Sequence, residues 1–413
     1  MRTLVLLSLM ATSLVSAGCL HPEGIAAHDV VGTTEPAVFH RTIVTPHLET
    51  PIDPNRNLLW CSTFQLAWNE TCRQAGGPLE IIDAPPMVAV LNKRAASRED
   101  IDEASCITAA GVGPKIIERI RRQFERKFPN RPVPRVLPPA ENVPPGGWVA
   151  FACLYKDLPF ERPFRRFPRA VRFVDGLVAS FVLGGPPPDL KLSPDGFPDE
   201  KQLREHRWRD EKIAEQVAVF DYKNPDDFII EIKTKSKEDR LLLAKVTPEA
   251  TLGHTVEAVR RRVEKSKPVN MDMDGDKLTV PVVDFDVTRK YRELIGKVLV
   301  QSGKPIVEAI QTIRFSLDEK GSRLESGVFI ESWGERMRPP YRMFFDKPFL
   351  ILLERRGAKR PYFALWVANS ELLLPMALPP KEPEPEEDFL NDPFGTGNFD
   401  PNDPFGGAFE NIE

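Results

Sequence analysis

The sequence predicts an α+β fold built around one large domain. The chain has 413 residues, of which 41% are hydrophobic and 28% are charged, so a sizeable core is available. Helical periodicity is concentrated in the first third of the chain, and apolar runs rich in strand-forming residues dominate the rest. Because helices and strands are segregated along the chain instead of alternating, a βαβ repeat is not expected.

The first residues predict export. Arg2 precedes an apolar run from Leu4 to Val15, and the small residues Ser16-Ala17-Gly18 follow it. This is the layout of a secretory signal, and the run is too short to span a bilayer permanently. We assign residues 1–18 to a signal peptide, and we expect the protein to be secreted or lipid-anchored at the cell envelope.

Cys19 leaves two exported forms open. Its position directly after Ala17-Gly18 resembles a bacterial lipobox, in which the cysteine becomes the lipidated first residue. Ser16 stands where such motifs usually have Leu, and plain export with cleavage after Ala17 is the alternative. Cys19 is therefore the lipidation candidate, and a lipid anchor is the one membrane attachment that we expect.

Residues 19–55 are rich in Pro, Thr and His and lack periodicity, which predicts a flexible leader before a domain over 56–375. Four cysteines follow Cys19, at positions 61, 72, 106 and 153. An oxidising compartment permits one or two disulfides among them, and buried free thiols are the alternative. None has the C-x-x-C spacing of a zinc site, so no metal is predicted there.

A basic amphipathic helix is predicted near residues 116–128. Isoleucine and phenylalanine recur at three- and four-residue spacing, and basic residues from Arg119 to Lys127 fill the other positions. The preceding Gly111–Lys115 resembles the turn of a helix-hairpin-helix motif, which binds DNA phosphates. A net charge of −4 and the export signal argue against binding to nucleic acid, and an ordinary helix start is the alternative. The Arg119–Lys127 helix is also a candidate site for a sulfated polysaccharide.

Other segments complete the predicted elements. Leu66–Cys72 is expected in a buried helix, and two Pro-rich connectors are expected at 129–145 and 184–199. Five apolar segments predict strands: Trp148–Tyr155, Phe228–Ile232, Leu278–Val283, Ile310–Leu317 and Phe349–Leu353.

The C-terminal segment 376–413 predicts a disordered acidic tail. From Pro380 onward it contains ten acidic residues and one Lys, which gives −9, so the rest of the chain carries +5. The five residues Asn391–Gly395 recur as Asn402–Gly406. A solvated end and a short docking motif are both open for this segment.

Several segments resemble serpins, and they occur in serpin order. Trp148–Lys156 with Pro163-Phe164 resembles the family's central strand, and Phe220–Ile232 resembles a strand pair. Leu278–Phe285 is similar to a Leu-Pro-x-Phe strand, and Phe345–Leu352 looks like the C-terminal Pro-Phe strand. The resemblance spans roughly 57–370. It implies helices around a large central mixed sheet with smaller sheets, and an exposed reactive-type loop near the C-terminus.

The resemblance implies a bait mechanism. A protease cuts the exposed loop, and the loop then inserts as a new strand into a sheet and carries the attached protease with it. Here the loop is 319–347, and its hinge comprises Glu319, Gly321, Ser322 and Leu324. Alternate residues from Ser322 to Ile330 are small or apolar, which suits insertion with one face buried. The target would be an extracytoplasmic serine or cysteine protease.

The residues that follow the hinge leave a non-inhibitory role open. Inhibitory members have small residues after the hinge, whereas this chain has Arg323, Leu324 and Glu325, and overpacking by Leu324 costs about 1–3 kcal/mol. The alternative is a serpin-fold binding or structural protein of the cell envelope.

The candidate reactive bond is Arg336–Met337. Arg338 is disfavoured because Pro339 follows it, and both arginines could equally be solvated loop charges.

No catalytic motif is found. There is no G-x-S-x-G elbow, phosphate loop or H-E-x-x-H pair among the six His. Asp272, Asp274 and Asp276 mimic the start of a calcium loop, but Lys277 and Val283 replace the required Gly and Glu, which indicates a turn. We therefore expect no enzyme activity, no cofactor, no metal, and a monomer.

Overall fold

The computed structural model describes residues 39–93, 96–129, 131–134, 137–184, 199–273, 275–306, 308–320 and 338–377. All of them belong to one compact unit. Of the sites predicted above, Cys19, Gly321, Ser322, Leu324, Arg336 and Met337 lie outside these residues, as does the tail from 378 onward.

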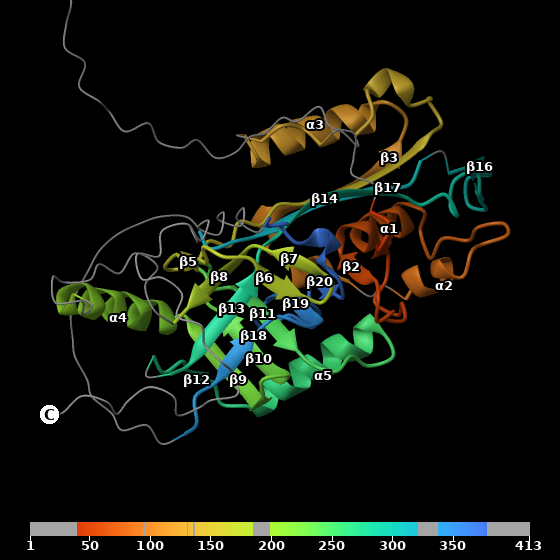
Figure 1. The fold of residues 1–413 in the computed structure, drawn as a ribbon. Coiled ribbons are helices and arrows are strands. Elements are labelled where there is room, and N and C mark those ends of the chain that lie inside the picture. The colour runs from red at the N-terminus through yellow and green to blue at the C-terminus, as the bar shows by residue number, and fades with distance from the viewer. Residues whose placement is uncertain are drawn as a thin grey trace, which may run out of the picture. The chain divides into compact units, whose positions relative to one another are not determined.

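The largest element is an eight-stranded mixed sheet (Figure 1). Its neighbouring strands are antiparallel except for the first pair, which is parallel. Several strands are buried along their whole length, which explains why they are continuous apolar runs instead of alternating patterns. In spatial order the strands are β1 (Thr42–Thr45), β2 (Asn57–Cys61), β20 (Phe363–Val367), β19 (Phe349–Arg355), β11 (Asp239–Lys245), β10 (Asp227–Ile232), β9 (Val217–Asn224) and β12 (Val269–Asn270).

Helix α5 (Leu252–Lys265) covers one face of this sheet. Thr251 begins the helix, because its side-chain oxygen accepts a hydrogen bond from the His254 N–H. The apolar stripe Val256, Val259 and Val263 belongs to one buried cluster with Trp366 and other residues of the sheet.

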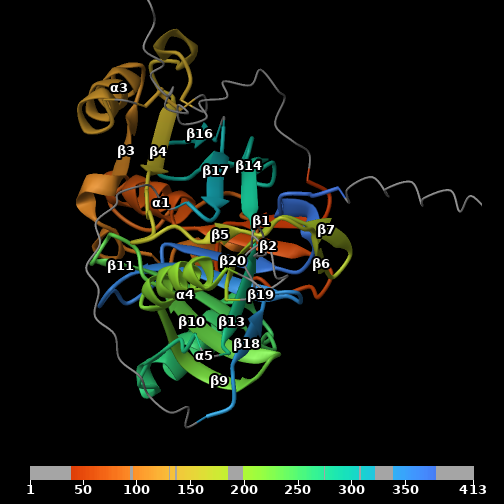
Figure 2. The same ribbon diagram turned by 60° about the vertical axis from the view of Figure 1, so that its left-hand side comes forward.

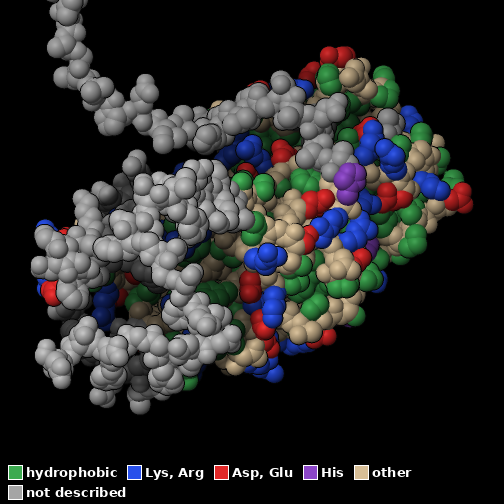
Figure 3. Space-filling view, viewed as in Figure 1, with side chains coloured by type: hydrophobic (Ala, Val, Ile, Leu, Met, Phe, Trp, Pro, Cys, Tyr) green, Lys and Arg blue, Asp and Glu red, His purple; other side chains and the backbone are tan. Residues whose placement is uncertain are grey.

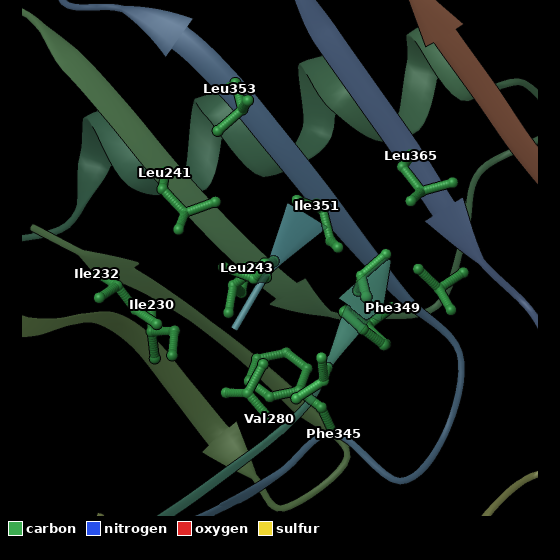
Figure 4. Packing of buried hydrophobic residues seen from close by; sticks show 14 of the residues in the cluster. Ile230, Ile232, Leu241, Leu243, Val280, Phe345, Phe349, Ile351, Leu353 and Leu365 are labelled. Atoms are coloured by element: carbon green, nitrogen blue, oxygen red, sulfur yellow. The ribbon is translucent and has the colours of Figure 1, made fainter. Parts of the chain in front are cut away.

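The opposite face packs against a four-stranded sheet. Figure 4 shows the side chains of strands β10, β11 and β19 on that face gathered around Val280 and Phe345. The small sheet has the order β18 (Arg342–Phe344), β13 (Lys277–Pro281), β8 (Ser180–Leu183) and β5 (Arg165–Arg166). Helix α4 (Glu200–Ala214) contacts β8.

Two further strand pairs lie side by side (Figure 2). In one pair, β3 (Cys106–Val112) is antiparallel to β4 (Trp148–Leu154), and in the other, β14 (Val283–Lys290) is antiparallel to β17 (Ile310–Leu317). Helix α1 (Thr63–Gln74) contacts both strands of the first pair, and helix α3 (Lys115–Lys127) packs on the same pair. The smaller elements are α2 (Met87–Leu91), β6 (Val171–Phe173), β7 (Gly176–Val178), β15 (Val298–Leu299), β16 (Lys304–Pro305) and the 3₁₀ turn Ser370–Leu372.

The expected α+β class is confirmed, and the predicted helices and strands are found close to their expected bounds. One boundary is wrong, because the leader predicted for 19–55 overlaps the folded domain. Residues 42–45 form β1, which pairs with β2 over four residues. The Glu371 carboxylate also accepts hydrogen bonds from the backbone N–H groups of His40 and Arg41. Glu371 is 330 residues from Arg41 in the sequence, so composition gave no sign of this contact.

All four domain cysteines are free thiols. Cys153 is the cross-strand partner of Ile107, so Cys106, one residue away, points to the other face of the β3–β4 pair. Cys153 accordingly packs in the cluster under α3, whereas Cys106 packs against the main core. A disulfide between these two is therefore excluded by the register. No described helix is long and apolar enough to cross a membrane.

Candidate functional site

The candidate site is the gap between β4 and β17. Among the described residues, β4 pairs only with β3, and β17 pairs only with β14. Each of these two strands therefore presents one edge with unpaired backbone groups. Figure 2 shows the order β3, β4, β17, β14, so the two unpaired edges are neighbours.

The segments that flank β4 and β17 are connected at both ends of the gap. At one end, the Phe164 N–H donates a hydrogen bond to the Glu319 carbonyl oxygen over 2.9 Å. At the other end, Trp148, Ile306 and Ala309 pack against one apolar cluster. Since β4 runs from Trp148 toward Phe164 and β17 runs from Ala309 toward Glu319, the two strands are parallel to each other.

Glu319 is the one predicted hinge residue within the described part of the chain. Its carboxylate forms an ion pair with Arg166 of β5 over 2.7 Å, and its side chain is 12% exposed. The segment 321–337 therefore begins at the Phe164 end of the gap. A strand formed by this segment in the gap would run antiparallel to both β4 and β17, which is the geometry of a simple hairpin with β17.

Arg338 follows the other end of that segment. The sequence allowed it to be an ordinary solvated loop residue, but in the structure its side chain is bound to other residues. Its guanidinium donates two hydrogen bonds to the carboxylate of Asp276, over 3.0 and 2.6 Å. The Asp276 side chain is fully buried, and its Oδ1 also accepts a hydrogen bond from the Tyr341 N–H over 2.7 Å. The guanidinium lies 3.6 Å from the Tyr341 ring centroid. Hydrogen bonding to Asp276 raises the pKa of Arg338 above its usual value.

Asp276 thus has a structural role. Its carboxylate accepts a hydrogen bond from the Asp272 N–H over 2.9 Å, which closes the turn that was predicted in place of a calcium loop. Both of its oxygens also accept hydrogen bonds from Arg338. The side chain of Arg338 is therefore engaged by Asp276 and by the Tyr341 ring.

The side chains along the gap are partly apolar. Ala152 and Leu154 of β4 and Phe315 of β17 are half-buried and pack against the main core. On the outer side, α3 covers β4, whereas Thr312, Arg314 and Ser316 of β17 are exposed. An added strand would therefore meet apolar side chains on its inner face.

Beneath the gap, a buried polar network fixes β17. The Gln311 side chain donates hydrogen bonds to the Cys61 carbonyl oxygen (3.1 Å) and to the Thr63 hydroxyl (2.9 Å). It also accepts a hydrogen bond from the Tyr291 hydroxyl over 2.7 Å. The β14–β17 pair is thereby attached to the start of α1, whereas the β3–β4 pair and α3 share an apolar cluster of their own.

The thiols of the β3–β4 pair are not activated as nucleophiles. Burial raises the pKa of both the Cys106 and the Cys153 thiols to about 12, so both are protonated at neutral pH. Across the described ranges, no group of three or more His, Cys, Asp or Glu residues is placed to hold a metal ion.

Sequence reasoning missed Arg166 and the pairing of Asp276 with Arg338. The residues of each pair are far apart along the chain, and neither pair shares a motif. The only local signal was the Asp272–Asp276 turn itself, which placed Asp276 correctly but did not give its partner.

No family model and no curated protein matches the chain. Solved serpins are similar to it. One is Serpin48, a highly specific serpin in the insect Tenebrio molitor, with 11% identity and a TM-score of 0.42 over 76% of this chain and 92% of that one. Another is the mouse protein-Z dependent protease inhibitor, with 10% identity and a TM-score of 0.43 over 76% and 91%.

Proposed function

We propose that this protein is a bait-type inhibitor of an extracytoplasmic serine or cysteine protease. The observation that carries the proposal is the pair of parallel edges of β4 and β17, which have no partner strand among the described residues and whose flanking segments are connected where segment 321–337 begins. In this role the protein is the substrate of the protease and not itself an enzyme. The signal-like residues 1–18 support an extracytoplasmic target.

The length of the segment agrees with insertion. A cut at Arg336–Met337 leaves residues 321–336 attached through Glu319, and sixteen extended residues reach about 53 Å. The eight residues of β17 span about 26 Å. The released segment can therefore run the full length of the gap and pair with both edges.

Because the Asp276–Arg338 pair holds the chain on one side of the proposed cut, only the residues on the other side are free to move. After such a cut, the new end at Met337 stays beside the Asp276–Arg338 pair, whereas residues 321–336 are released at their far end. We propose that the gap widens by displacement of β3, β4 and α3 together, because these elements share their own apolar cluster. The polar network of Gln311 holds the other pair in place.

The test uses the full-length protein and a panel of trypsin- and chymotrypsin-like proteases. The expected result is a covalent complex that survives denaturing electrophoresis. The cut protein should also melt at a higher temperature than the intact one, by about 1–2 °C for each kcal/mol gained on insertion. Loop cleavage with an active protease and an unchanged melting temperature would overturn the proposal.

A non-inhibitory binding role is the second candidate, and the bulk of Leu324 favours it. Leu324→Ala separates the two. If bulk at the hinge slows insertion, the substitution accelerates complex formation, whereas a loop that never inserts gives no complex in either form. Val328→Ala, four residues further along the same alternation, is the matched control.

A further inference from the structure

Helix α3 carries an unusual stripe of positive charge. Lys115, Arg119, Arg122 and Arg126 are spaced so that they lie on one face of the helix, opposite the buried Ile116, Ile120 and Phe124 side chains. All four basic residues are exposed. At 1.5 Å per residue the stripe is about 16 Å long. We call these four residues the α3 stripe.

The α3 stripe lacks the neutralisation found on other helices. Within the described residues, no ion pair is found for any of its four members. Arg119 donates one hydrogen bond to the Ala110 carbonyl oxygen, and Glu118 and Glu125 lie along one flank. On α5, by contrast, Arg260 pairs with Glu354, and Arg262 pairs with Asp221 and Asp227.

Charge elsewhere is mixed. On the face shown in Figure 3, Lys and Arg side chains are interspersed with Asp and Glu over the described surface. Like charges three and four residues apart destabilise a helix. A row of four unpaired cations is therefore a surface that favours an anionic partner.

We infer that the α3 stripe is the docking surface of the chain's own C-terminal segment, residues 378–413. This segment contains ten acidic residues and one Lys, and five of the acids fall within Glu382–Asp388. It is the one long stretch of strongly negative charge in the chain, and the rest of the molecule carries +5. The −9 of this segment is opposite in sign to the charge of the α3 stripe and exceeds its four positive charges.

The segment is long enough to reach the stripe. Its 36 residues have a contour length of about 120 Å. A domain of about 300 residues has a radius of gyration of about 19 Å. Single exposed ion pairs are weak, but attachment to the same chain supplies a high effective concentration, so several weak pairs together suffice. The contact should be strong at low ionic strength and screened by salt.

The test is zero-length cross-linking of the full-length protein with a carbodiimide. The reagent activates a carboxyl group, and the amine of Lys115 then displaces the urea by-product to form an amide. At low salt, peptide mass spectrometry should find amides between Lys115 and acids of residues 382–413. R122Q/R126Q should lose these links. R204Q/R209Q, which removes two charges from exposed positions of α4, should retain them.

Three results would overturn the inference. The first is the absence of Lys115–tail amides while other surface amides form. The second is a set of amides that R122Q/R126Q or high salt leaves unchanged. The third is amides found only between two molecules, which would assign the stripe to a second copy. A variant with the acids of 382–388 replaced by their amides should lose the links without any change at α3, and this separates loss of docking from damage to the helix.

Discussion

At the scale of single residues, a buried carboxylate fixes the place where segment 321–337 rejoins the described structure. Asp276 is fully buried, yet its oxygens receive two backbone N–H groups and two guanidinium bonds from Arg338. A buried charge is tolerated only with such partners. The two residues are 62 positions apart, so no local pattern could have predicted the pair.

Arg338→Gln should lower the free energy of unfolding by about 2 kcal/mol, because it leaves Asp276 buried without a cation. The loss should be smaller than for a buried carboxylate without any hydrogen-bond donor, because the Asp272 and Tyr341 N–H groups still donate to Asp276. Urea unfolding measures it. Arg342→Gln, at an exposed position four residues on, should change stability by less than about 0.5 kcal/mol. Equal effects of the two substitutions would contradict this role for Arg338.

A second residue-scale prediction concerns acid. Hydrogen bonds from Lys245 and then Lys347 lower the pKa of Asp226 below 3.8, with Nζ–oxygen distances of 2.8 and 2.6 Å. Because the pKa of Asp226 is lower in the folded state than in the unfolded state, its ionised carboxylate stabilises the protein at pH values above the unfolded-state pKa of 3.8. This contribution is lost as the pH falls through the folded-state pKa. Asp226→Asn should therefore cost about 0.5–1 kcal/mol at neutral pH, because the side chain is about half exposed.

The difference between Asp226→Asn and the unsubstituted protein should disappear well below pH 3.8. Urea titrations over this range test the sign. The control is Asp157→Asn, an exposed position for which no ion pair is found in the described ranges. A difference that does not change with pH would show that Asp226 acts through packing instead of charge.

At the scale of elements, the sequence was informative where apolar residues are dense or alternate. Residues 349–355 form a strand that is buried on both faces, and residues 310–317 form a strand whose alternate residues face the core. Strand β1 was missed, because its four residues lie in a Pro- and Thr-rich stretch. It depends on β2 and on Glu371, 330 residues away. Partners of that kind override local composition.

Phe124→Ala should act mainly on one unit. Phe124 is fully buried between α3 and the β3–β4 pair and makes edge contacts with Phe128 and Tyr155. Its loss should cost about 3–5 kcal/mol locally. Hydrogen exchange should therefore accelerate in β3 and β4 more than in β11 and β19. Leu352→Ala in the main sheet is the control. Uniform acceleration in Phe124→Ala would show that α3, β3 and β4 do not form a separate unit.

At the scale of the whole molecule, the gap between β4 and β17 was beyond sequence reasoning. It arises from four segments that lie between residues 106 and 317, and no local pattern encodes which edges stay unpaired. The resemblance to serpins predicts Glu319 as a hinge residue, and this role stays a prediction. It could not supply Arg166, because that partner comes from a separate small sheet.

The ends of the described domain meet at one hairpin. Arg41 pairs with Asp175 in the turn between β6 and β7, and the Met376 N–H donates to the Leu177 carbonyl oxygen. A circular permutant that joins residue 377 to residue 39 by a short linker, with new termini at Gly303, should therefore fold with nearly the same unfolding free energy. Circular dichroism and urea titration would measure this, and a loss above about 2 kcal/mol would contradict it. Fusion partners attached directly at residues 39 and 377 would consequently emerge beside the same β6–β7 hairpin.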